Sequence, residues 1–208
     1  MNEEGLAAKR KGQRRIKTTD SDHNLPVAPN LLKQSFRSSG PNQVYVGDIT
    51  YIKTKEGWIY LAVIIDLYAR SVVGYALADH MRKALVIEAL KNAYVRRGGF
   101  IPKAIFHSDR GSQYASHAFR QTLQKFGMKQ SMSARGDCYD NAACETFFAT
   151  LKTEIPDKTK HLNKKEATQA IGNYISFYNT KRLHSYNGYL PPLEAEMKWW
   201  RNRLEVAA

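Results

Sequence analysis

The chain has 208 residues, of which 43% are hydrophobic and 25% charged, so it is long enough to enclose one sizeable core. Its 32 Lys and Arg against 19 Asp and Glu give a net charge of +13, which favours a polyanionic partner, by default nucleic acid. Two cysteines are too few for a disulfide framework or a four-cysteine zinc site, and without a long apolar run, a basic amphipathic helix or a signal peptide we expect a cytoplasmic protein with no membrane partner.

Residues 1–43 are predicted to form a basic arm rather than a domain. The stretch KRKGQRRIK at 9–17 leads into residues rich in Pro, Asn, Asp and Thr that show no apolar period. A solvated basic tail is the alternative, but the rest of the chain is also basic, which favours contacts with phosphates. The contacting side chains would be Lys9, Arg10, Lys11, Arg14 and Arg15.

Three strands and a helix are predicted next. VYVGDITYI (44–52) alternates between two faces, whereas WIYLAVIID (58–66) and SVVGYAL (71–77) are nearly continuous apolar runs. Together they form an antiparallel meander. MRKALVIEALKNAYVRR (81–97) has apolar residues at helical spacing and stops at two glycines, so the following strand, KAIFHS (103–108), can return parallel to the first.

A further helix and a fifth strand complete the predicted sheet. SHAFRQTLQKFG (116–127) is predicted as a helix with Ser116 as its N-cap, and MKQSM (128–132) as a short strand. This order indicates an α/β chain with a five-stranded mixed sheet and helices on both faces. Few common folds open with such a meander, and the ribonuclease-H-like fold is one of them, so residues 44–156 would form a core of that fold.

Residues 157–208 are predicted to be a helical segment packed on this core. The helix before it would begin behind Asp140 or Asn141 and end at Pro156. Residues 163–182 form a long amphipathic helix, and the tail is expected to be an extended segment followed by a short helix.

Three acidic residues stand at positions that suit a metal site. Asp48 lies in the middle of the first strand, where a carboxylate must be paired or bound to a cation. Asp109 ends the fourth strand and faces Asp48 if the two strands are neighbours, and two anions that close repel unless a divalent ion neutralises them. Glu145, on the helix after a polar loop, is the candidate third ligand, and Lys152 lies two turns further along the same side.

Each acid also has a simpler explanation. Asp48 could pair with an arginine such as Arg70, and Asp109 could close an Asx turn before the glycine two residues later. Glu145 could be an ordinary first-turn acid that the helix dipole favours. The three acids together, on two strands and a late helix of this topology, favour the metal site.

Four neighbouring residues are predicted to have supporting roles. His107 and Asn141 would lie just behind the metal ligands, although His107 could equally be packed in the core and Asn141 would act by positioning the helix of Glu145. Arg110 and Arg135 would contact phosphates, with solvated surface arginines as the alternative.

Three stretches resemble the acidic motifs of DDE transposases of the insertion sequence 3 family, which are related to retroviral integrases. They are NQVYVGDITYI, FHSDRGSQY and SMSARGDCYDNAACETFFATLKTE. Thirty-five residues separate Asp109 from Glu145, which is the interval of that family, and YNTKRLHSYNGYLPP (178–192) is similar to its C-terminal signature. The resemblance extends from about Asn24 to Glu194.

This resemblance implies a function and a set of site residues. Asp48, Asp109 and Glu145 match the catalytic triad, which would bind two Mg²⁺ or Mn²⁺ ions. Lys152 matches a basic position near the DNA backbone. The same site would cleave DNA strands with water and transfer them with a 3′-hydroxyl at insertion-sequence ends. The partners would be the element ends and target DNA, bound by a homo-oligomer in the bacterial cytoplasm in association with the nucleoid.

Two features depart from the family pattern. Tyr45 stands where the family usually has Trp, and the arm at 1–43 resembles only the end of a truncated DNA-binding segment. Two other functions therefore stay open. One is a non-catalytic DNA-binding remnant of a truncated transposase, and the other is a ribonuclease-H-like nuclease.

Overall fold

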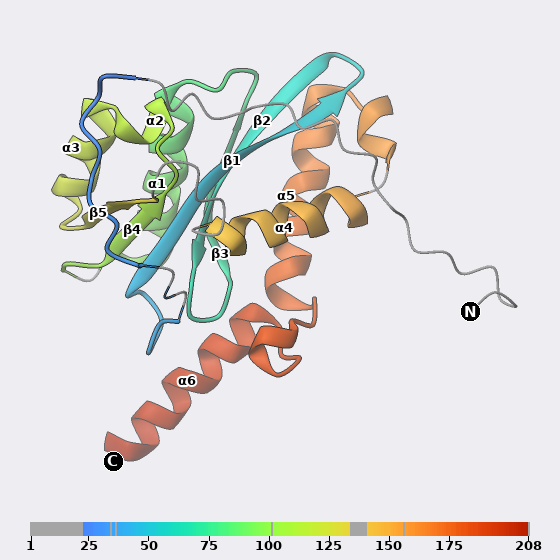
Figure 1. Cartoon of the computed structure of the whole chain (residues 1–208). Helices are drawn as coiled ribbons and strands as arrows, with labels where there is room; N and C mark the ends of the chain where they lie inside the picture. Colours follow the sequence, from blue (N-terminus) through green and yellow to red (C-terminus); the bar gives the residue numbers. More distant parts are fainter. Residues whose placement is uncertain are drawn as a thin grey trace, which may run out of the picture.

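The computed structural model describes residues 23–33, 35, 37–100, 102–133, 141–155 and 157–207, and places a five-stranded mixed sheet at the centre (Figure 1). Its strand order is β3-β2-β1-β4-β5, in which β1, β2 and β3 are antiparallel and β4 and β5 run parallel to β1. This is the sheet that the sequence predicts. The strands are β1 (Val44–Thr54), β2 (Gly57–Asp66), β3 (Val72–Ala78), β4 (Ile105–Ser108) and β5 (Lys129–Met132).

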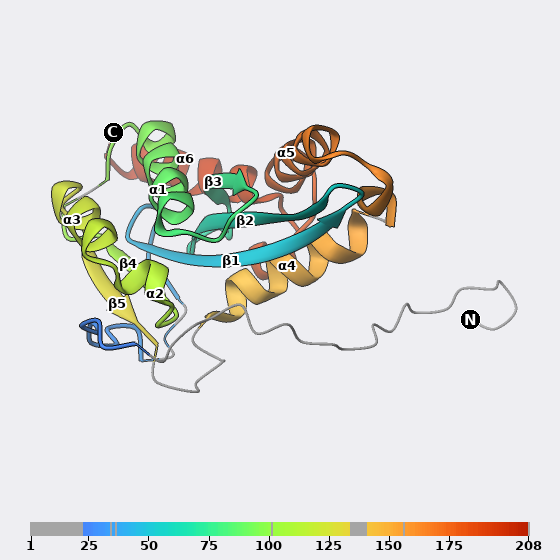
Figure 2. The same ribbon diagram turned by 90° about the horizontal axis from the view of Figure 1, so that it is seen from above.

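Helices cover both faces of the sheet, as expected, and α1 and α4 lie on opposite sides of β1 and β2 in Figure 2. Successive side chains of a strand point to opposite faces, so Tyr45 enters one buried core and Val46 the other. The first core is closed by α1 (Lys83–Arg97), α2 (Ser112–Ala115) and α3 (His117–Lys125). The second is closed by α4 (Ala142–Glu154) and α5 (Lys164–Thr180).

Two predicted helices differ from the structure. The expected helix at 116–127 is preceded by α2, and Ser116 separates α2 from α3 because its extended backbone interrupts the helical path. Its hydroxyl accepts a hydrogen bond from the Phe119 N–H at 3.3 Å, so its predicted role as N-cap is confirmed. The expected short C-terminal helix is wrong, because α6 spans Pro192–Ala207 and has 16 residues.

Two 3₁₀ helices complete the described elements, η2 (Asp157–His161) and η3 (Ser185–Asn187). Across the described ranges, no helix combines the length and the apolar character needed to cross a membrane.

Part of the predicted arm packs on the core and runs beside β5 (Figure 1). The Leu31 N–H donates to the Ser131 hydroxyl at 2.9 Å, and the Met132 N–H donates to the Pro29 carbonyl at 3.4 Å. Leu32 is buried in the core beneath α4. Residues 29–32, which the sequence assigned to the arm, therefore pack against the core. The division of the chain into arm, core and C-terminal segment stays a prediction.

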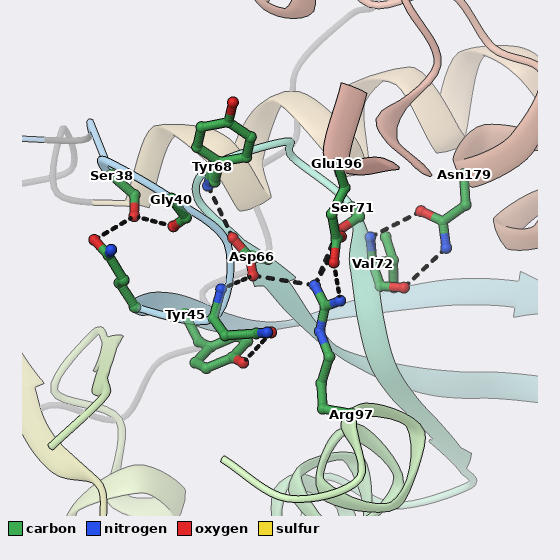
Figure 3. A network of polar contacts seen from close by, with 12 residues as sticks. Ser38, Gly40, Tyr45, Asp66, Tyr68, Ser71, Val72, Arg97, Asn179 and Glu196 are labelled. Atoms are coloured by element: carbon green, nitrogen blue, oxygen red, sulfur yellow. Dashed lines mark hydrogen bonds and ion pairs between the residues drawn. The ribbon is translucent and has the colours of Figure 1, made fainter. Parts of the chain in front are cut away.

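A buried ion-pair network, formed by Asp66, Arg97 and Glu196, ties α6 to the core (Figure 3). The guanidinium of Arg97 lies 3.0 Å from a carboxylate oxygen of Asp66 and contacts both oxygens of Glu196. Nearby, the Asn179 side chain makes two hydrogen bonds to the backbone of Val72, which fastens α5 to β3. Burial raises the pKa of Asp66 even though the Arg97 cation opposes that shift.

Candidate active site

Asp48 and Asp109 lie at the point where the paired strands β1 and β4 separate. The last register pair of the parallel strands β1 and β4 is Gly47 and Ser108; Asp48 is the next residue of β1, and Asp109 is the first residue after β4. Neighbouring strands lie about 4.8 Å apart, so the two carboxylates start from adjacent points at this fork. The predicted neighbourhood of the first and fourth strands is therefore confirmed.

Backbone N–H groups hold one oxygen of each aspartate. Asp48 Oδ1 accepts from the Ile49 N–H at 2.7 Å, and Asp109 Oδ1 accepts from the Gly111 N–H at 2.9 Å. The second bond is the Asx turn that was the simpler explanation for Asp109. This turn fixes the position of the carboxyl group beside the fork and is compatible with a role as metal ligand.

Helix α4 brings Glu145 toward the same fork. Asn141 is its N-cap residue, but the Asn141 side chain makes no cap hydrogen bond within the described residues and its amide donates to the Gly47 carbonyl at 3.3 Å. Cys144 is fully buried in the same core cluster as Val46 of β1. These two contacts anchor the start of α4 on β1, while Glu145, in the first helical turn, is exposed to solvent.

The electrostatics of Asp48 show that the predicted residues lie near one another. Burial raises the pKa of Asp48 well above its usual value, and repulsion from Asp109 and, less strongly, Glu145 adds to the shift. The Ile49 N–H and the Lys152 cation act in the opposite direction. Asp48 therefore lies in the field of both other acids and of the predicted phosphate-binding lysine.

The three carboxylates gather along one edge of β1 without converging on a single point. Within the part of the chain that the structure describes, no three His, Cys, Asp or Glu side chains are close enough to hold a metal ion. Glu145 is exposed to solvent, and like charges on the three carboxylates repel one another. Three carboxylates are nevertheless a donor set of the kind that Mg²⁺ and Mn²⁺ prefer, so the residue types fit such ions.

Lys152 lies along the same edge of β1 as the acids. Its ammonium nitrogen is 4.7 Å from the centroid of the Tyr51 ring, a cation–π contact. Arg70, the partner considered for Asp48, lies over the ring of Tyr186 at 4.1 Å. The charge of Lys152 opposes the rise in the pKa of Asp48.

Two other predicted residues have structural partners here. Arg110 donates from Nε to the Ser133 carbonyl at 2.7 Å and so fastens the end of β5. His107 is fully buried, with Nδ1 2.8 Å from the Ser131 hydroxyl, as in the core-packed alternative, and its role behind the metal ligands stays a prediction. The phosphate contact of Arg110 stays a prediction.

Six predicted phosphate contacts fall outside the described residues. They are Lys9, Arg10, Lys11, Arg14, Arg15 and Arg135. Their roles stay predictions.

The far end of α4 is anchored by residues to which the sequence assigned no partner. Arg182 makes a two-pronged ion pair with Glu154, with its shortest contact at 2.6 Å, and the Tyr174 hydroxyl donates to the same carboxylate at 3.0 Å. The Arg182 hydrogen bond lowers the pKa of Glu154. Arg182 belongs to the C-terminal signature, so the signature pointed to this residue but not to its partner.

Asn141→Ala is expected to weaken Mn²⁺ binding by about 10- to 100-fold, because groups that orient metal ligands typically contribute that much. The variant loses the bond that holds α4 against Gly47, so Glu145 is less well placed. Titration calorimetry with Mn²⁺ measures the change. Asn92→Ala is the matched control, since Asn92 makes a similar amide-to-carbonyl bond to Tyr75 on another helix. Equal Mn²⁺ affinity of the Asn141 variant and the parent chain would rule out this role.

Solved structures with the same architecture are catalytic cores of retroviral integrases. The HTLV-2 integrase catalytic core domain in complex with magnesium, in its trimeric form, aligns with a TM-score of 0.62 and 18% identity, covering 77% of this chain and 99% of that one. The catalytic core domain of BIV integrase aligns with a TM-score of 0.57 and 12% identity, over 78% and 99%. These alignments confirm the ribonuclease-H-like fold.

Family models and curated relatives give the closer relationship. Two models described as integrase core domain match residues 38–138 and 126–192. The insertion element IS600 uncharacterized 31 kDa protein of Shigella sonnei is 46% identical over 183 residues, which cover 88% of this chain and 67% of that protein. Transposase InsF for insertion sequence IS3A of Escherichia coli (strain K12) is 44% identical over 178 residues, which cover 85% and 61%.

The chain therefore spans about two thirds of the length of these curated relatives. Together the matches extend over most of its own length, and they agree with the acidic motifs and the C-terminal signature. The chain belongs to the integrase core domain family and, within it, to the transposases of the insertion sequence 3 group.

Proposed function

We propose that this chain is the catalytic domain of a DNA transposase, which cuts DNA strands at insertion-sequence ends and joins them to target DNA with the help of divalent metal ions. The observation that carries the proposal is the fork between β1 and β4. Asp48 and Asp109 occupy adjacent positions there, and Glu145 on α4 is close enough to raise the pKa of Asp48.

The three acids would hold two Mg²⁺ or Mn²⁺ ions. Asp48 is influenced by both other acids and would bind both ions, while Asp109 and Glu145 would each complete the ligand set of one. When bound, such ions lower the pKa of an attacking water or 3′-hydroxyl and stabilise the leaving oxygen. Because none of the acids needs to become attached to the DNA, the same site could run both cleavage and strand transfer.

The protein side chains would also move protons as the metal binds. Burial and the neighbouring acids raise the pKa of Asp48, so its carboxyl holds a proton more tightly than an exposed aspartate does. A metal ligand must be deprotonated, so binding of a cation would release this proton. The three carboxylates, which repel one another, would hold such an ion together.

DNA is the proposed partner because the chain carries a net charge of +13 and the positive charge of Lys152 acts on Asp48. Assembly of several copies on DNA is part of the proposal. Two solved structures of the HTLV-2 integrase catalytic core domain are of a trimeric and a dimeric form of that protein. A bacterial cytoplasmic location at the nucleoid completes the proposal, given the bacterial relatives.

The two alternatives are less well supported. A non-catalytic remnant does not require the three acids, yet Asp109 and Glu145 both act electrostatically on Asp48. A ribonuclease-H-like nuclease of another kind shares the fold, but the 35-residue interval between Asp109 and Glu145 and the C-terminal signature are those of the transposase family.

A cleavage and joining assay tests the proposal. Labelled duplexes that carry the ends of the element are incubated with the chain and Mg²⁺, Mn²⁺, Ca²⁺ or chelator. We expect nicked products with 3′-hydroxyl ends and joined products with Mg²⁺ and Mn²⁺ only. DNA binding without either product in any metal would favour the remnant, and preferential cleavage of RNA–DNA hybrids or junctions without joining would favour the other nuclease.

A further inference from the structure

The tip of the β1–β2 hairpin carries a group of aromatic and basic side chains on one face. In the antiparallel register Tyr51 is opposite Tyr60 and Lys53 is opposite Trp58, so all four share a face. Closer to the centre of the sheet the same face is covered by α1. The hairpin projects past α1 toward α5 in both views (Figures 1 and 2). Trp58 is left 40% exposed.

Tyr51 and Trp58 are held in a defined arrangement. Their ring centroids are 5.1 Å apart and their planes meet at 79°, an edge-to-face contact. Lys152 lies over the Tyr51 ring at 4.7 Å, and Lys53 beside Trp58 is exposed. The hairpin turn itself is fastened, because the Lys55 N–H donates to the Leu162 carbonyl at 3.0 Å. The tip is thus a supported surface of two aromatic rings and two cations.

This surface lies further along β1 than the acids, and Tyr51 points to the opposite face of the sheet from Asp48 because the two residues are three apart. Tyr51 follows Asp48 by three residues on the same strand, which corresponds to about 10 Å. Lys152 links this surface to the acids. Its ammonium group lies over the Tyr51 ring, and its positive charge opposes the rise in the pKa of Asp48. In a stacked DNA strand, about 10 Å corresponds to roughly three nucleotides.

The ligand that fits is an unpaired nucleobase. Aromatic rings combined with basic side chains are the means by which proteins bind single strands, where each base offers its flat face for stacking. A base inside a duplex has both faces covered by its neighbours, so it cannot use such a surface. A base near a frayed or opened DNA end can.

We propose that Trp58, supported by Tyr51 and flanked by Lys53 and Lys152, stacks an unpaired base of the DNA strand that enters the active site. This inference rests on the proposed function, and it adds a preference for DNA ends whose terminal nucleotides are not paired. Trp58 would position the strand and take no part in the reaction itself.

Tryptophan fluorescence tests the stacking without any catalysis. The chain has three tryptophans, so a Trp199→Phe, Trp200→Phe chain reports on Trp58 alone. We expect oligothymidine to quench this fluorescence in the absence of metal, and an oligonucleotide of equal length with abasic sites to quench it far less. Equal quenching by both, or none by either, would overturn the proposal.

Binding measurements with matched variants provide the second test. Trp58→Ala is expected to weaken binding to a duplex with a short single-stranded end by about 5- to 100-fold, with less than about a twofold effect on a blunt duplex. Trp200→Ala is the control, because Trp200 is 44% exposed but lies on α6, away from the hairpin (Figure 1). Trp58→Phe should retain most of the affinity.

The outcomes separate this inference from the proposed function. If the chain does not cleave DNA but oligothymidine still quenches the Trp58 fluorescence without metal, only the catalytic proposal is contradicted. Normal cleavage with a Trp58→Ala chain that binds both duplexes like the parent chain overturns the stacking only. If Trp58→Ala leaves DNA binding intact but abolishes self-association in sedimentation, the surface joins protein copies and the stacking proposal is wrong.

Discussion

Asp109→Asn is expected to reduce DNA cleavage and strand transfer by at least about a thousandfold, equivalent to about 4 kcal/mol of transition-state stabilisation. The substitution removes a negative charge that the metal ions need. It leaves the local structure in place, because the asparagine oxygen can still accept the Gly111 N–H bond that Asp109 Oδ1 accepts at 2.9 Å. Both reactions are measured with labelled DNA ends in Mg²⁺.

The matched control for this variant is Asp79→Asn. The Asp79 side chain is 64% exposed and pairs only loosely with Lys164, at 3.5 Å, so its loss should change neither activity nor stability appreciably. Unchanged melting of the Asp109 variant would show that its fold is intact. Full activity of the Asp109 variant would remove Asp109 from the site.

Arg97→Met is expected to lower the free energy of unfolding by about 3–5 kcal/mol, because it leaves two buried carboxylates without their cation. The side chains of Asp66 and Glu196 are 0% and 8% exposed, so water cannot replace the guanidinium. For a chain of this size the melting temperature should fall by about 6–20 °C. Arg182→Met is the control, since its pair with Glu154 is about one third exposed and should contribute about 1 kcal/mol or less.

The stability deficit of Arg97→Met should shrink as the pH falls from 7 to 5. Burial already raises the pKa of Asp66 with Arg97 present, and removal of the cation raises it further. A carboxyl whose pKa is raised on folding contributes most to stability below its unfolded pKa of about 3.9, and that contribution is lost as the pH rises through the folded value. Urea unfolding at the two pH values measures the deficit. A deficit that is constant or larger at pH 5 would contradict this explanation.

The sheet could be predicted because the hydrophobic patterns and turn residues along the sequence match the way the strands pack. The alternation of Tyr45 and Val46 reflects two separate cores, and the glycines after α1 mark the end of the crossover that makes β4 parallel to β1. The length of α6 could not be predicted in this way. Its residues Met197, Trp200 and Leu204 are exposed, so their helical spacing does not correspond to a buried face.

The part of the candidate site that depends on the pairing of neighbouring strands could be predicted. Asp48 and Asp109 meet because two parallel strands share a register, and the sequence contains both strands. Asn141 shows where such reasoning ends, because its side chain bonds to Gly47, 94 residues away, rather than to its own helix. The pairing of Arg97 with Glu196 likewise joins residues 99 positions apart, and no local pattern marks it.

Diffraction from crystals of the chain bound to a DNA end and soaked in Mn²⁺ tests the central claim most directly. The anomalous signal locates the ions independently of activity. We expect manganese within about 2 Å of carboxylate oxygens from Asp48, Asp109 and Glu145, with Glu145 turned toward the fork. Manganese bound only at other sites, with the three carboxylates as far apart as they are without metal, would contradict the assignment.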